Sequence, residues 1–255
     1  MKFNSLCLGA VLFIAAAPIM AADTPLDSAL QISSPDVGVA SDFAGMATVS
    51  FTVRNLSTRT INGFSYSVLG RYADGGERTA RQNEDLYAPL MLDRLPAMAK
   101  TVESRASMQS LGPGQSKHVT ALLPLSGEGQ LPVSVTAKLL MIAFDDNTAL
   151  GDPIEITQLQ EARALWVEMI SAIVADLQRM KRSPSPKEAA HNLILSLSGN
   201  ASQDAIAAVR MRTLQGVSKA LEGSREPAQT IEELLAPYEA LLEFGMKRSN
   251  LTKEK

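Results

Sequence analysis

Three aspartates, Asp145, Asp146 and Asp152, form the densest group of candidate metal ligands in the sequence, and Asn147 lies between them. Hard cations such as calcium prefer several oxygen ligands that one flexible loop can supply. The group lacks the ligand spacing of an EF-hand, and Asp, Asn and Gly are also ordinary residues of solvated turns. We therefore interpret the segment as a turn and keep the three aspartates as a weak calcium candidate.

Sequence motifs for catalysis or cofactor binding are absent from the chain. The two histidines, His118 and His191, have no zinc-ligand spacing. The chain has no nucleophile elbow, no Ser-x-x-Lys and no glycine-rich nucleotide loop. Paired carboxylates like those of glycoside hydrolases stay open as an alternative, because the fold sets their separation. We predict no cofactor and favour a protein that is not an enzyme.

An apolar cluster is the best candidate for a partner-binding surface. Residues 79–108 are long for a loop in a compact domain, so the segment is either covered or a surface loop that binds a partner or ligand. Within the segment, an apolar anchor is formed by Leu86, Tyr87, Leu90, Met91 and Leu92. Trp166, the single tryptophan, is a second candidate, because an exposed tryptophan is a natural anchor whereas a buried one is ordinary core.

The elements that would position these residues divide near Thr157. Before it, residues 47–54 and 64–68 alternate between apolar and polar types, and we expect these two strands to pair as a hairpin. Residues 117–125 form a third strand. Residues 133–144 end in a continuous apolar run, which is typical of a central strand covered on both faces. Ile154 and Ile156 belong to the expected closing strand.

The turn at residues 111–116 has the pattern Leu-x-Pro-Gly-x-Ser and precedes a strand. It resembles the turn of immunoglobulin-like or fibronectin-type modules in exported bacterial proteins, and the resemblance covers about half of the chain. It implies an antiparallel β-sandwich, a fold that usually binds or spaces other molecules. Because this fold hosts many functions, the resemblance assigns no site residues. The Cys…Trp…Cys signature of antibody domains is missing.

After Thr157, apolar residues recur at spacings of three and four, which predicts an α-helical bundle. Three pairs match the capping-box spacing and predict helix starts, and Pro237 predicts that the last helix is kinked or divided. The pairs are Thr157 with Gln160, Ser185 with Glu188, and Thr230 with Glu233. We expect an α+β chain with the sandwich at residues 23–156, the helical domain at 157–248 and a frayed tail at 249–255.

Residues 1–22 have the composition of an export signal: a basic start at Lys2, a short apolar run and small residues at Ala21 and Ala22. The apolar run is shorter than the ~20 residues that span a bilayer, so we expect cleavage and no membrane span afterwards. Cys7, the single cysteine, lies inside this signal, near its start. Lipidation of Cys7 is not expected, and the mature chain would contain no thiol or disulfide.

These observations predict a periplasmic or secreted protein that acts through contacts with an unknown protein partner. The formal net charge of −3 disfavours nucleic acid as that partner. Two alternatives remain open. One is a carboxylate-based hydrolase of envelope polymers, and the other is an assembly factor that forms homo-oligomers through its helical domain.

Overall fold

The computed structural model describes residues 25–88, 109–199 and 204–254. The predicted signal at residues 1–22 lies outside these residues. The chain is α+β: strands dominate the amino-terminal part and helices the carboxy-terminal part. It divides into two compact units. The first unit contains the chain up to Leu86, Ser110–Thr157 and the chain from Leu251. The second contains Tyr87–Gln109 and Gln158–Asn250.

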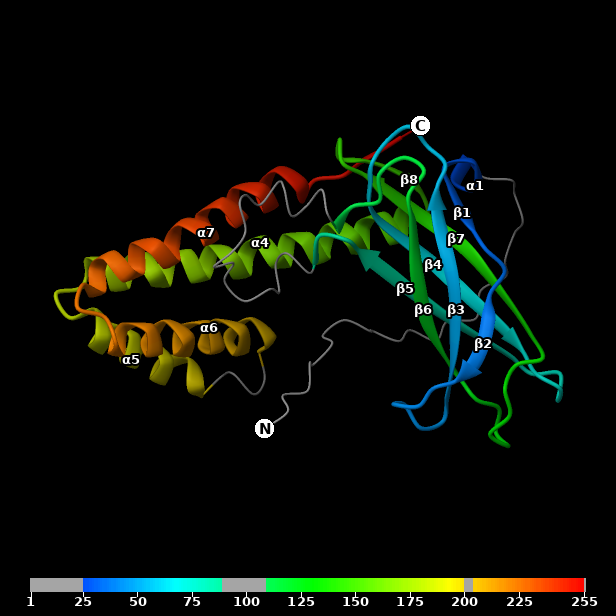
Figure 1. The fold of residues 1–255 in the computed structure, drawn as a ribbon, viewed down its shortest axis with the longest axis horizontal. Helices are drawn as coiled ribbons and strands as arrows, with labels where there is room; N and C mark the ends of the chain where they lie inside the picture. The colour runs from blue at the N-terminus through cyan, green and yellow to red at the C-terminus, as the bar shows by residue number, and fades with distance from the viewer. Residues whose placement is uncertain (1–24, 89–108, 200–203, 255) are drawn as a thin grey trace. The chain divides into compact units, whose positions relative to one another are not determined.

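The first unit is built from two sheets (Figure 1). In one sheet, the central strand is β3 (Met46–Asn55). It pairs antiparallel with β1 (Leu30–Ile32), β2 (Asp36–Val39) and β6 (Ser116–Pro124). The other sheet has the order β5 (Glu77–Asp85), β4 (Ile61–Arg71), β7 (Ser134–Phe144), β8 (Thr148–Gly151) and β9 (Thr252–Lys253). Only the β8–β9 pair is parallel among these described pairs. A short helix, α1 (Pro25–Ala29), precedes β1.

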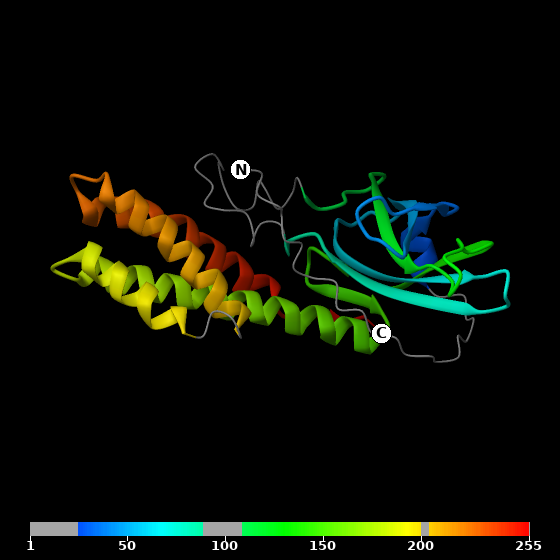
Figure 2. The ribbon, with the colours of Figure 1, turned by 90° about the horizontal axis from the view of Figure 1, so that it is seen from below.

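One hydrophobic core joins the two sheets, which form two layers in Figure 2. Alternate residues of β3 are buried, as its period-2 pattern predicts. Phe51 from one sheet meets Tyr66 from the other edge to face, with ring centroids 5.0 Å apart. β7 lies between β4 and β8, which confirms the expectation of a central strand from its continuous apolar end.

The predicted hairpin between the strands at 47–54 and 64–68 is wrong. These strands are β3 and β4, and they lie in different sheets. Asn55 ends β3 and is completely buried at the crossing. Its amide nitrogen donates to the carbonyl oxygens of Arg59 (2.7 Å) and Leu111 (2.8 Å), and its amide oxygen accepts from the Ser57 amide (2.9 Å) and hydroxyl (2.7 Å). This network turns the chain away from its own sheet, and an alternating pattern alone cannot distinguish that crossing from a hairpin.

The closing strand is β8, and the residues expected in it, Ile154 and Ile156, lie in a helix instead. That helix, α4 (Pro153–Arg182), begins four residues before the predicted start at Thr157. Asp152 Oδ1 accepts a hydrogen bond from the Ile154 amide (2.9 Å), so Asp152 caps the helix and Pro153 occupies its first turn. Thr157 therefore lies inside the first turns, where its hydroxyl donates to the Pro153 carbonyl oxygen.

The second unit consists of helices that share one apolar core, as the sequence predicts. After α4 come α5 (Pro186–Ser198), α6 (Ala205–Glu222) and α7 (Pro227–Arg248). Ser185 precedes α5 as predicted, although its side chain makes no capping bond. Thr230 does not start α7, because the helix begins one turn earlier at Pro227. Pro237 lies inside α7, which continues through it. Among the described residues, no helix has the length and apolar character needed to cross a membrane.

The tail at residues 249–255 was expected to fray, but its described part is ordered. Leu251 is 7% exposed, and β9 adds to the edge of β8 through two backbone hydrogen bonds. The Thr252 amide donates to the Asn147 carbonyl oxygen (2.7 Å) and the Glu254 amide to that of Ala149 (2.9 Å). The polar composition of this tail does not predict β9, because the strand is held only by backbone pairing and the burial of Leu251.

Candidate contact surface

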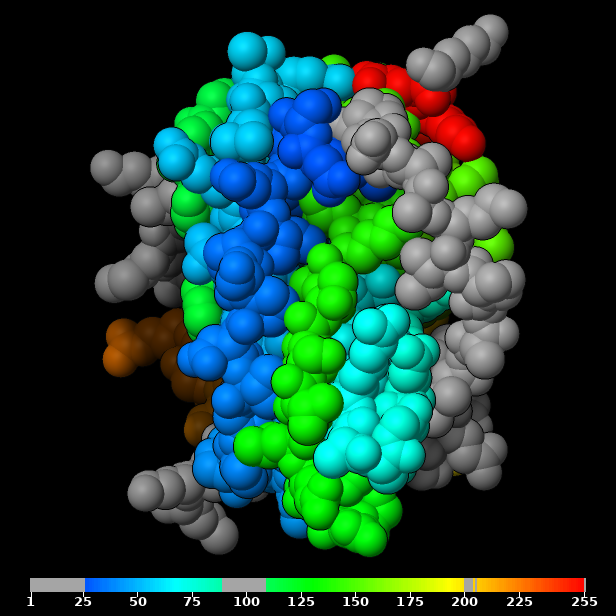
Figure 3. Space-filling model, turned by 90° about the vertical axis from the view of Figure 1, so that its right-hand side faces the viewer, coloured from blue at the N-terminus to red at the C-terminus, as the bar shows by residue number. Residues whose placement is uncertain are grey.

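Three turns, with the strand ends that flank them, meet at one end of the first unit, and we call them the Phe43 rim: residues 39–45, 71–76 and 124–133. Backbone and side-chain hydrogen bonds join them. The Leu125 amide donates to the Gly45 carbonyl oxygen (2.9 Å), the Val133 amide to that of Arg71 (2.7 Å), and the Tyr72 hydroxyl to that of Pro124. Figure 3 shows the same three parts of the chain side by side, in blue, cyan and green.

The Phe43 rim displays large apolar side chains to solvent. Val39 at the end of β2 is 69% exposed, Phe43 is 55% exposed and Val133 is 70% exposed. The turn that carries Phe43 is closed by its own backbone: the Ala40 amide donates to the Met46 carbonyl oxygen, and the Met46 amide to that of Phe43. Gly45 has a φ of 79°, which glycine adopts readily. A closed turn therefore holds an aromatic side chain outward.

Each turn of the Phe43 rim also carries one exposed carboxylate: Asp42, Asp74 and Glu128. Asp74 Oδ1 accepts from the Gly76 amide (2.8 Å), which fixes its turn. The nearby pair Arg71 and Glu77 is neutral as a whole, with Nε and Oε1 2.8 Å apart. The rim thus carries exposed apolar side chains and exposed carboxylates.

The sequence-predicted contact residues lie elsewhere. Leu86 is 2% exposed in the core of the first unit, and Tyr87 is 4% exposed in the core of the second. Tyr87 packs edge to face on Phe244, with ring centroids 5.0 Å apart. Both side chains are therefore core residues and not an exposed surface. Leu90, Met91 and Leu92 lie outside the described residues. Trp166 is partly buried against the core of the second unit.

Two of the three aspartates considered as calcium ligands, Asp146 and Asp152, make side-chain contacts with the protein. Asp146 forms an ion pair with Arg59 at 2.7 Å and accepts from the Thr148 amide at 3.0 Å. Burial raises the pKa of Asp146, but hydrogen bonds from Thr148 and Arg59 outweigh burial and lower it. Asp152 caps α4. Within the described ranges, no three His, Cys, Asp or Glu side chains form a group that could hold a metal ion.

Arg59 links the first unit's turns to its last strand. Its guanidinium lies 3.6 Å from the centroid of the Phe144 ring and forms ion pairs with Asp146 (2.7 Å) and Glu254 (2.5 Å). Burial lowers the pKa of Arg59, and the hydrogen bonds to both carboxylates outweigh it and raise the pKa. The Arg59 cluster therefore stabilises the sheet edge around β8 and β9.

Glu155 is a buried carboxylate of the first unit. Glu155 lies in the first turn of α4 and is 3% exposed, and its Oε1 lies 3.6 Å from Nη1 of Arg81. Burial raises its pKa, whereas the buried Ser65 hydroxyl and the charge of Arg81 act in the opposite direction. A raised pKa suits a general acid, but a substrate cannot reach a side chain that is enclosed in this way. His118 and His191 are exposed on β6 and α5.

Comparisons with known proteins assign no family to this chain. No protein-family model matches it, and no curated protein matches it either. One solved structure that matches is a crystal structure of a hypothetical protein from Peptoclostridium difficile 630. The match has 12% sequence identity and a TM-score of 0.32, and it covers 52% of this chain and 90% of the other.

Proposed function

We propose that this is an exported protein that acts without catalysis, by holding another protein at the Phe43 rim. The observation that carries the proposal is the exposure of Phe43 and Val133 on joined turns at one end of the first unit, and of Val39 at the strand end that leads into the Phe43 turn. Exposed apolar side chains that cluster within a polar border are typical of protein interaction sites. The signal-like residues 1–22 support a periplasmic or secreted location.

We further propose that the first unit is an immunoglobulin-like sandwich. Its two sheets share one core, and the turn at residues 111–116 leads into β6 in the way that the resemblance implies. Turns at one end of such a sandwich are a common place for partner contacts, because a rigid scaffold positions them. The Phe43 rim has that placement.

The partner that fits this rim has an apolar pocket for Phe43 and basic groups around it. Asp42, Asp74 and Glu128 would then face opposite charges at the border of the interface. Aromatic anchors that enter a pocket carry much of the free energy of such interfaces. Phe43→Ala should therefore weaken binding by about tenfold or more.

Site-specific photocrosslinking in the native compartment tests this function. A photoreactive phenylalanine analogue placed at Phe43 and, separately, at Val133 should capture the same protein. Leu56 is the matched control, because it is 48% exposed in the same unit but follows the opposite end of β3. Equal capture from Leu56, or no adduct from Phe43, would contradict the proposal.

A further inference from the structure

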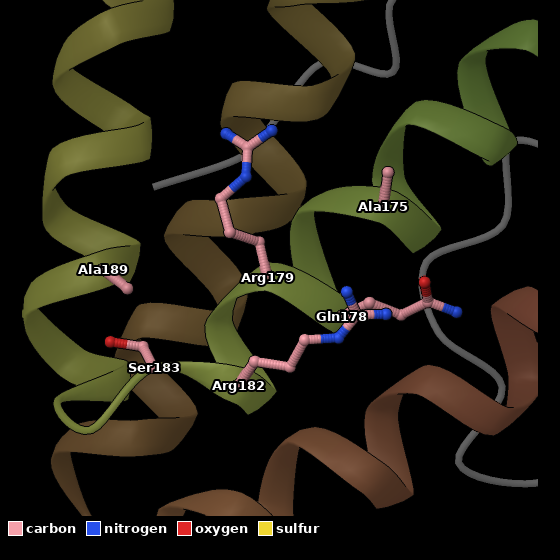
Figure 4. Close-up of a pocket in the computed structure, with 6 residues that line it drawn as sticks. All are labelled: Ala175, Gln178, Arg179, Arg182, Ser183 and Ala189. Carbon is pink, nitrogen blue, oxygen red and sulfur yellow. The ribbon is translucent and has the colours of Figure 1, made fainter.

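The second unit has an open hollow of about 500 Å³ that the proposed contact surface does not involve. It lies where α4 ends and α5 begins (Figure 4). Six residues line it: Ala175, Gln178, Arg179, Arg182, Ser183 and Ala189. All belong to the second unit, so the hollow is complete within that unit.

Two arginines give the hollow its charge. Neighbouring cations of the second unit have acidic partners: Lys181 Nζ lies 2.6 Å from Glu232, and Arg210 Nη2 lies 2.8 Å from the buried Asp176. Across the described residues, Arg179 and Arg182 form no ion pair, and both side chains are exposed. A helix carboxy-terminus favours cations, but the dipole supplies no bidentate acceptor for a guanidinium.

The neutral groups add directional hydrogen bonding. Gln178 Nε2 donates to Glu239 Oε1 (3.2 Å), so its amide oxygen is left as an acceptor. Ser183 Oγ accepts from the Ser185 amide (3.2 Å), so its proton can be donated. Ala175 and Ala189 contribute methyl groups to the walls. The hollow therefore offers two guanidinium groups for anions, one acceptor for an N–H group and small apolar surfaces.

We propose that this hollow binds an acidic peptide segment of a partner protein. Guanidinium groups bind carboxylates with paired hydrogen bonds, which accounts for Arg179 and Arg182. A peptide also brings backbone N–H groups for Gln178 and aliphatic carbon for the alanines. A bare phosphate has no N–H donor, so it would use only the positive half of the site.

Fluorescence anisotropy with the full chain tests this proposal at low salt. The probe is a labelled ten-residue peptide that contains four Asp or Glu residues, and its control is the same peptide with Asn and Gln in their place. The acidic peptide should bind more tightly, and Arg179→Ala and Arg182→Ala should each weaken its binding by about tenfold. Arg179→Lys should retain part of the affinity, because it keeps the charge but not the fork of donors.

Arg225→Ala is the matched control variant, because Arg225 has no ion pair among the described residues and does not line the hollow. It should bind the peptide as the unmodified protein does, and circular dichroism should show equal helix content for all variants. Equal binding of the two peptides, or an equal loss with Arg225→Ala, would overturn the proposal. Binding of inorganic pyrophosphate without binding of the acidic peptide would also overturn it.

Discussion

Single buried polar residues do much of the positioning in the first unit. Asn55, completely buried, donates to two carbonyl oxygens and accepts from Ser57 where the chain crosses between sheets. Buried polar groups are stabilising only while their partners are present, because an orphaned group has lost its water. Residues of this kind are therefore the sensitive points of the fold.

Asn55→Ala should lower the free energy of unfolding of the first unit by about 3 kcal/mol, because it leaves several buried partners without hydrogen bonds. Amide hydrogen exchange in β3 and β6 measures this loss. Asn83→Ala on the exposed side of β5 is the control and should change stability by less than about 0.5 kcal/mol. A similar loss for both variants would contradict the role of Asn55.

Glu155 predicts a pH dependence. A carboxyl whose pKa is raised by burial binds its proton more tightly in the folded state. Its contribution to stability is therefore greatest below the ordinary pKa of Glu and is lost as pH rises through the pKa of Glu155 in the folded state. The stability of the unmodified protein relative to Glu155→Gln should fall as pH rises from below the ordinary pKa of Glu through the raised pKa of the folded state. Urea denaturation across this range measures the difference, and a difference that rises with pH would refute the prediction.

At the scale of elements, close backbone approach limits what the sheet edge can accept. Gly151 ends β8 with a φ of 111°, and a Cβ there would lie 2.2 Å from the Leu140 carbonyl oxygen. Backbone atoms of β7 cannot move aside as a flexible side chain can. The register Met141 with Gly151 therefore requires glycine at this position.

Gly151→Ala should destabilise the first unit by about 3 kcal/mol or more, through strain in φ and overlap with β7. Gly127→Ala is the control, because nothing lies within 4 Å of its Cβ and its turn is exposed. Thermal unfolding of the two variants compares them. A small effect at Gly151 would mean that β8 can shift its register.

Sequence patterns predicted elements better than they predicted connections or sites. Alternation located β3, β4, β6 and β7, because half-buried strands repeat every two residues. The crossing at Asn55 and the helix start at Pro153 depend on contacts or capping that these periodicities do not contain, although Asp152 before Pro153 is a signal for that start. The exposure of Phe43 and of Val133, which begins the predicted strand at residues 133–144, could not be predicted, because a single exposed apolar residue has the same sequence signature as a buried one.

At the scale of the whole molecule, the compartment to which the chain is directed determines which partners it can bind. Residues 1–22 predict removal of the signal and release of a chain without cysteine. Mass measurement of the protein from its native compartment should show an amino-terminus near Asp23. Leu12→Arg should abolish export, because it interrupts the apolar run, whereas Cys7→Ser should leave export unchanged. Retention of residues 1–22, or loss of export with Cys7→Ser, would contradict cleavage without lipidation.

The last strand has a consequence for how the chain is made. β9 completes the edge of β8, yet every residue of α4, α5, α6 and α7 comes between them in the sequence. Because synthesis proceeds from the amino-terminus, the ribosome must finish the helices before Leu251 and the Arg59 partner Glu254 exist. Until then β8 has one unpaired edge, which is the kind of edge that other strands can join. Wherever the chain folds, this edge of β8 is therefore closed only when residues that follow four helices in the sequence join the sheet.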